Sequence, residues 1–129
     1  MSDPFSDAEV ISSYTADQAI ADGVLVEPLP DDFPKMLLTA AVHAKIMETP
    51  TTQELEERGG YNQKVDDRTP EQRIIPLFMD ALRVAAKGVK KDPEEYLWTE
   101  GLEGNVTGKK LWLSINEFSG LTIMFPEDY

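Results

Sequence analysis

The chain has 129 residues, no cysteine and a formal net charge of −12, from 24 acidic and 12 basic side chains. A chain of this length suits one domain that buries roughly two-thirds of its unfolded surface. The lack of cysteine excludes disulfides, thiolate zinc sites and thiol nucleophiles, and it fits a reducing compartment. We therefore expect a single cytoplasmic domain, 1–129, with no secretory signal and no membrane span.

The N-terminal third is predicted to contain three short segments. Residues 1–8 are rich in serine, aspartate and proline, which indicates a flexible leader. Thr15 and Gln18 have the spacing of a capping box, which predicts a helix over 16–22 that ends at Gly23. The apolar run at 24–26, stopped by prolines, favours a short buried strand.

Two longer helices are expected in the middle of the chain. A broad apolar stripe predicts the first over 35–48. Thr69, a proline at the next position and Gln72 together predict the start of the second. Its apolar repeat runs to about Lys87, and Gly88 is placed to stop it.

Two features are expected to interrupt this helical region. The polar stretch 51–67, with paired glycines at its centre, predicts a mobile loop that has room for a helical turn over 53–58. Pro76 removes a backbone hydrogen bond inside the second helix, which predicts a kink or a restart there. The run 96–98, which follows this helix, fits either a short strand or a helical turn.

Alternating apolar residues at the end of the chain predict a β-hairpin. The two strands are expected over 111–116 and 121–125, and Gly120 closes the loop with a positive φ. Because two strands alone are marginally stable, we expect them to pair with the strand at 24–26. The predicted fold class is α+β, with two main helices packed on a small, mostly antiparallel sheet.

Catalytic residues are not indicated by the sequence. His43 is the only histidine and falls within the first long helix, where a position at the edge of the core accounts for it best. No phosphate loop, serine elbow or zinc motif is present, so no cofactor or metal is expected. An enzyme is therefore the less favoured class.

The distribution of charge favours a protein partner. Residues 1–34 carry eight acidic side chains and neither lysine nor arginine. Such a field repels nucleic acid and anionic membrane and attracts basic protein surfaces. Trp112 adds a large aromatic on one sheet face, which suits partner binding or a homodimer. The candidate partner-binding residues are Asp17, Asp22, Glu27, Asp31, Asp32 and Trp112.

Four stretches carry a resemblance to a known family. They are VISSYTADQAIADGVLV (10–26), LTAAV (38–42), the helix beginning near Arg68 and LTIMFPED (121–128). Together they resemble a family of small uncharacterised proteins carried by bacterial phages, plasmids and other mobile elements. The resemblance implies a genomic neighbourhood and a shared fold, and it assigns no functional residue.

Three functions are consistent with these features. The favoured one is a non-enzymatic acidic accessory protein of a mobile element that acts by protein binding. Its sharper form is a DNA-mimic-like inhibitor of a host nucleic-acid-binding or defence protein. The stretch SYTADQAIADGVLVEP also loosely resembles the opening of ADP-ribosyltransferase-like folds, which leaves that or another nucleotide-binding enzyme as an alternative. The third possibility is a structural protein whose acidity serves solubility only.

Overall fold

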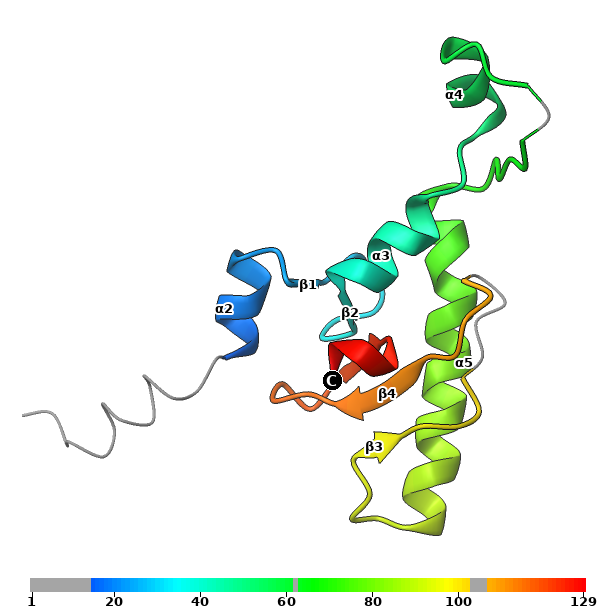
Figure 1. The fold of residues 1–129 in the computed structure, drawn as a ribbon. Coiled ribbons are helices and arrows are strands. Elements are labelled where there is room, and N and C mark those ends of the chain that lie inside the picture. The colour runs from blue at the N-terminus through cyan, green and yellow to red at the C-terminus, as the bar shows by residue number, and fades with distance from the viewer. Residues whose placement is uncertain (1–14, 62, 103–106) are drawn as a thin grey trace, which may run out of the picture.

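A computed structural model of the chain describes residues 15–61, 63–102 and 107–129 (Figure 1). The expected leader, 1–8, lies outside these residues. The helices and strands are α2 (Ala16–Ala21), β1 (Leu25–Val26), β2 (Leu37–Thr39), α3 (Ala40–Met47), α4 (Thr52–Glu57), α5 (Pro70–Lys91), β3 (Leu97–Trp98), β4 (Trp112–Ile115), β5 (Leu121–Met124) and the 3-10 helix η1 (Pro126–Asp128).

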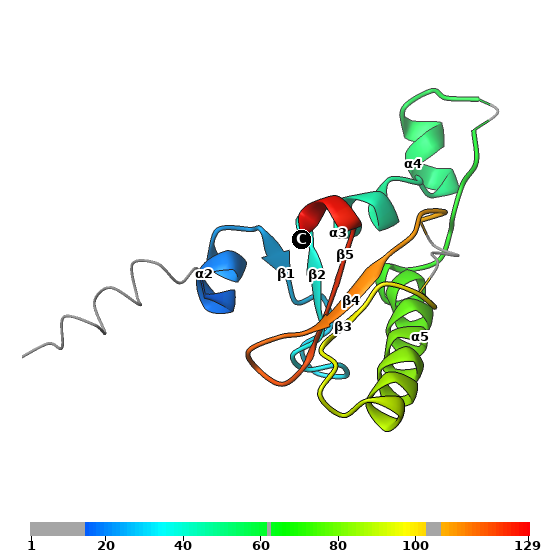
Figure 2. The ribbon, with the colours of Figure 1, turned by 60° about the horizontal axis from the view of Figure 1, so that its bottom comes forward.

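A five-stranded sheet with the order β1-β2-β5-β4-β3 forms the centre of the fold. Only the β2–β5 pair is parallel, and the other three pairs are antiparallel. Figure 2 shows α5 running alongside the sheet near β3 and β4. The α+β class, the two main helices and the C-terminal hairpin of β4 and β5 are therefore confirmed.

The hydrophobic core lies on the sheet face that α3 and α5 cover. Trp98, Leu113, Ile123 and Leu38 are in register across four strands, and all four are buried. This alignment gives one continuous apolar row across the sheet. The helices add buried side chains to the same core, including Val42, Ile46, Ile74, Leu77, Phe78 and Ala81.

The predicted start of the first long helix is wrong. Leu37–Thr39 form the strand β2, and the helix α3 begins at Ala40. The three residues of β2 are buried, and β2 lies between β1 and the parallel strand β5. A strand covered on both faces has a continuous apolar run, which sequence periodicity does not distinguish from a buried helix.

This error also changes how the strands pair. The C-terminal hairpin contacts β2, and β1 pairs with β2 instead of with the hairpin. The strand at 24–26 is also less buried than predicted, because Leu25 and Val26 are half-buried and Val24 is 51% exposed. An edge strand has neighbours on one side only, which explains its exposure.

The predicted starts of two helices, α2 and α5, are confirmed. Thr15 and Gln18 form a capping box at α2, and Thr69 and Gln72 form another at α5. Gly23 adopts φ +77° directly after α2. The helix α5 runs as one element through Pro76 and does not restart there. Local hydrogen bonds decide the two helix starts, so the sequence alone is enough to predict them.

The predicted roles of two glycines are wrong. Gly88 does not end α5, which continues to Lys91, and the positive φ in the hairpin loop belongs to Ser119 and not to Gly120. Each glycine instead allows a close approach. A Cβ atom on Gly88 would overlap the indole nitrogen of Trp98, and one on Gly120 would overlap the carbonyl oxygen of Lys35.

The predicted mobile loop, 51–67, contains α4, which confirms the expected helical turn. Hydrogen bonds close the base of this loop. The Asp66 amide donates to the Pro50 carbonyl at 2.8 Å, and the Thr52 amide donates to the Asp67 carboxylate at 2.7 Å. Figure 1 shows α4 projecting from the rest of the fold. The mobility of this segment stays a prediction.

Arg73 connects this loop to both main helices. Its side chain is buried and donates to the carbonyls of Ile46, Thr49 and Asp66. The guanidinium therefore satisfies carbonyl groups at the end of α3 and at both ends of the loop. The side chain of Arg73 thus supplies the hydrogen-bond donors that these carbonyls would otherwise need from backbone N–H groups. The Asp66 carboxylate lies 3.6 Å from the Nε atom of Arg73.

We predict that Gly88→Ala destabilises the protein. In an open helix this change stabilises by about 0.5–1 kcal/mol, but overlap with Trp98 should cost about 1–3 kcal/mol. Urea denaturation should show a lower free energy of unfolding, and Trp98→Leu should relieve part of the effect. A higher unfolding midpoint for Gly88→Ala would contradict the close packing.

We predict that Asp66→Asn destabilises the protein at neutral pH and has less effect in acid. Hydrogen bonding from Arg68 holds the pKa of Asp66 well below its usual range. The stability that this lowered pKa contributes is fully present above the unfolded value near 3.9 and is lost progressively as the pH falls from there toward the folded value. Urea denaturation gives the free energy of unfolding of wild type and variant. The difference between the two values should become smaller from pH 7 to pH 3.

The control for this measurement is Glu56→Gln. The Glu56 carboxylate is exposed and makes no ion pair with any described residue. The difference in free energy of unfolding between wild type and Glu56→Gln should therefore stay the same between pH 7 and pH 3. A constant difference between wild type and Asp66→Asn across the pH range would refute the role of the Asp66–Arg68 pair.

Candidate functional site

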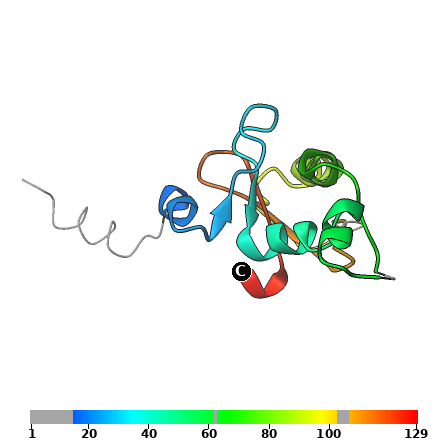
Figure 3. The ribbon, with the colours of Figure 1, turned by 90° about the horizontal axis from the view of Figure 1, so that it is seen from above.

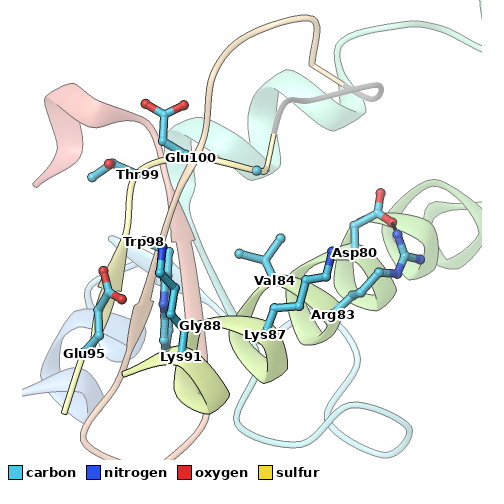
Figure 4. A pocket seen from close by; sticks show the side chains of 11 residues that line it. Asp80, Arg83, Val84, Lys87, Gly88, Lys91, Glu95, Trp98, Thr99 and Glu100 are labelled. Carbon is cyan, nitrogen blue, oxygen red and sulfur yellow. Dashed lines mark ion pairs between the residues drawn. The ribbon is translucent and has the colours of Figure 1, made fainter. Parts of the chain in front are cut away.

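One concave feature of the described residues is an open groove of about 860 Å³ (Figure 4). The second half of α5 forms one wall, and the segment 95–101, which contains β3, forms the other. We call it the α5–β3 groove. It is lined by Asp80, Arg83, Val84, Lys87, Gly88, Lys91, Glu95, Trp98, Thr99, Glu100 and Gly101.

Trp98 and Gly88 bring the two walls of the groove together. Trp98 is 7% exposed, and its indole packs directly over Gly88 of α5 (Figure 4). The indole Nε1–H is buried and has no hydrogen-bond partner among the described residues. A buried donor without an acceptor costs about 1–3 kcal/mol. The groove wall therefore holds an unsatisfied donor.

The α5 wall carries three cations. Arg83, Lys87 and Lys91 recur every four residues, which places them along one side of the helix. Arg83 pairs with Asp80 at 3.0 Å. Lys87 and Lys91 make no ion pair with any described residue. This wall therefore has a local positive charge in a protein whose net charge is −12.

The opposite wall carries two carboxylates. Glu100 pairs with Lys110 at 2.8 Å, so its charge is partly balanced at the surface. Glu95 makes no ion pair within the described part of the chain. The groove therefore presents a positive helix wall facing a strand wall with one unpaired carboxylate.

The strand β3 has a free edge beside the groove. It is the last strand of the sheet and pairs with β4 alone. The Ile115 amide donates to the Tyr96 carbonyl at 2.9 Å, and Leu97 is opposite Ser114 at the next position. Because hydrogen bonding alternates along an antiparallel pair, the backbone N–H and C=O of Leu97 point away from β4. Thr99 is two residues further along, so its backbone N–H and C=O also point away from β4.

A second, smaller pocket of about 340 Å³ lies under α2 at the other edge of the sheet. Its lining is mainly apolar and includes Ala16, Ala19, Leu25 and Met124. The Glu117 carboxylate accepts a hydrogen bond from the Ala16 amide, which fixes α2 against the hairpin loop. The pocket offers neither a cation nor an unsatisfied buried side-chain donor among the described residues.

The predicted acidic residues fall into two groups. Asp17 lies on α2 and Asp22 is its C-cap, whereas Asp31 and Asp32 lie in the connection between β1 and β2. The Glu27 carboxylate accepts a hydrogen bond from the Lys35 amide at 2.7 Å and so helps to order that connection. Figures 2 and 3 show α2 and the connection as separate projections of the molecule.

Trp112 lies on the sheet face opposite the core. It is half-buried, is in register with Met124, and contacts Tyr129 edge-on with ring centroids 5.6 Å apart. Hydrogen bonding with the Tyr96 side chain raises the pKa of the Tyr129 phenol. Tyr96 and Tyr129 are exposed, so Trp112 belongs to a small aromatic cluster that reaches the surface.

His43 lies on α3, as predicted, and is half-buried. It makes no hydrogen bond or ion pair with another described residue, so no carboxylate orients it for acid–base chemistry. Within 15–61, 63–102 and 107–129, no group of three potential ligands is arranged to hold a metal ion. None of the helices in these ranges has the length and apolar character needed to cross a bilayer.

Comparison of the chain with protein-family models, curated proteins and solved structures finds no match. The α5–β3 groove is the feature that sequence reasoning missed. The four-residue spacing of Arg83, Lys87 and Lys91 was a usable signal for its basic wall. Nothing in the sequence pairs that wall with Trp98, because their contact depends on how β3 packs on α5.

Proposed function

We propose that this chain is a non-catalytic accessory domain that binds another protein in the α5–β3 groove. The single observation that carries the proposal is the row of cations on the groove wall, where Lys87 and Lys91 make no ion pair with any described residue. The Trp98 indole N–H beside them is buried without a partner among the described residues, which in native proteins calls for an explanation such as an ordered water or an ion. Tryptophan is also among the residues that contribute most to protein interfaces.

The shape and charge of the groove favour a protein partner over other ligands. Small-molecule sites enclose most of the ligand surface, whereas this groove is open to solvent. Nucleic acid is disfavoured because Glu95 and Glu100 line the strand wall and the net charge of −12 repels phosphates. A polypeptide segment suits an open groove with walls of different charge.

The setting that we propose is the cytoplasm of a bacterium that carries a phage, plasmid or related element. The four stretches that resemble the mobile-element family support this setting. In that setting, an accessory protein acts on host proteins by occupying or blocking a surface. The proposal assigns no cofactor and no metal.

A second candidate function is inhibition of a basic host protein by the acidic N-terminal surface. Asp17, Asp31 and Asp32 are exposed and make no ion pair with any described residue, which favours this candidate. In its sharper form these carboxylates imitate DNA phosphates on a nucleic-acid-binding or defence protein. Residues 1–34 carry acids and neither lysine nor arginine, whereas the α5–β3 groove has a basic helix wall, so the two candidates predict different partners.

The groove is tested with Lys87→Glu/Lys91→Glu. Peptides selected from a random library against the wild-type domain should bind the double variant at least about tenfold more weakly, since two favourable charges become repulsive. Isothermal titration calorimetry measures the affinity, and circular dichroism checks the fold. The control is Lys90→Glu, which changes a charge on the same helix outside the groove lining. Equal losses in both variants would refute the groove as the binding surface.

The acidic surface is tested with Asp17→Asn/Asp31→Asn/Asp32→Asn. A panel of purified host DNA-binding proteins is titrated with the domain between 50 and about 300 mM salt. If the second candidate is right, binding weakens steeply with salt and the triple variant binds at least about tenfold more weakly.

The control for the triple variant removes three acids elsewhere. Glu56→Gln/Glu57→Gln/Glu94→Gln makes the same change in net charge at exposed positions outside the N-terminal surface. It should bind like wild type. Binding that is independent of salt, or that falls equally in both triple variants, would exclude the acidic surface as a specific site.

A further inference from the structure

We infer that the occupant of the α5–β3 groove is an extended, acidic segment of the partner protein, which pairs with β3 as a sixth strand of the sheet. This inference rests on the proposed function and names the chemistry of the partner. Two features of the described residues support it: the free edge of β3 and the spacing of the cations on α5.

The free edge of β3 offers the backbone groups that an added strand requires. The N–H and C=O groups of Leu97 and Thr99 point away from β4, toward the open side of the sheet. Peptides that bind by strand addition use such an edge, and a helix lying beside it provides contacts for their side chains. Here α5 is that helix, and the groove is the space between the two elements (Figure 4).

The spacing of the cations along α5 matches the spacing of alternate residues in an extended chain. Lys87 and Lys91 are four residues apart, a rise of about 6 Å along a helix. Alternate residues of a strand are about 6.6 Å apart and lie on the same face. Acidic side chains at positions i and i+2 of the added strand therefore meet Lys87 and Lys91 in turn. Neither lysine has an ion-pair partner among the described residues.

The opposite wall selects against acid at the intervening position. Glu95 lines the strand side of the groove and is not paired within the described part of the chain, so a second carboxylate beside it is repelled. The expected motif is therefore acidic, neutral, acidic.

The test uses two synthetic hexapeptides of identical composition, Val-Glu-Val-Glu-Val-Thr and Val-Val-Glu-Glu-Val-Thr, with blocked ends. In the first the acids alternate, and in the second they are adjacent. The first should bind the full chain at least about tenfold more tightly. In nitrogen-15 NMR spectra it should shift the Leu97 amide and the Trp98 indole resonance. Lys91→Glu should remove this binding, whereas Lys90→Glu should not.

Strand pairing is tested separately with N-methylated peptides. Methylation of the backbone amides that face β3 blocks strand pairing, while methylation of the alternate amides leaves it intact. Binding should therefore be lost in one N-methylated series and kept in the other. Equal binding by both series would overturn strand addition, even if library peptides still bind the groove and the proposed function stands.

Two further results would overturn the inference in different ways. Library peptides that bind in a Lys87- and Lys91-dependent manner but carry no alternating acids would overturn the acidic motif and leave the proposed function intact. A doubling of mass at high protein concentration, with the Leu97 amide protected from exchange in the absence of peptide, would assign the edge to a second copy of the chain. Failure of the proposed function itself is recognised by library peptides that bind independently of Lys87 and Lys91.

Discussion

The contact between Gly88 and Trp98 is the constraint on which the functional half of this fold depends. A glycine in the last part of α5 lets the indole of β3 lie directly on the helix backbone, which brings the edge strand and the helix together. The same contact leaves the indole N–H buried and unsatisfied. Close packing and the unsatisfied donor therefore have one origin, and both are features of the α5–β3 groove.

The distribution of charge separates the molecule into two regions. The first 34 residues contain acids and no lysine or arginine, while α5 carries a row of cations beside β3. Lys87 and Lys91 are left without ion pairs among the described residues, although the chain has twice as many acidic as basic side chains. The chain therefore has many carboxylates, but none of the described ones pairs with these two lysines. The positive wall is thus suited to an acidic group of a partner protein.

Features fixed by neighbouring residues could be predicted, and features fixed by distant contacts could not. The capping boxes at Thr15 and Thr69 depend on hydrogen bonds over three residues, so their sequence signals were sufficient. The strand β2 exists because β5, more than 80 residues away, supplies its parallel partner. The same apolar residues without that partner suit a helix, which is why the first helix was predicted to begin too early.

The sequence by itself determined the α+β class, the starts of α2 and α5, the C-terminal hairpin and the acidic N-terminal region, because composition, alternation and capping are local properties. Only the tertiary structure decided that Gly88 makes room for Trp98 instead of ending a helix, and that β3 lies at a free edge beside the cations of α5. The physical reason is that the two walls of the groove come from segments that are apart in the sequence. They meet only when the apolar row of the sheet packs against α5.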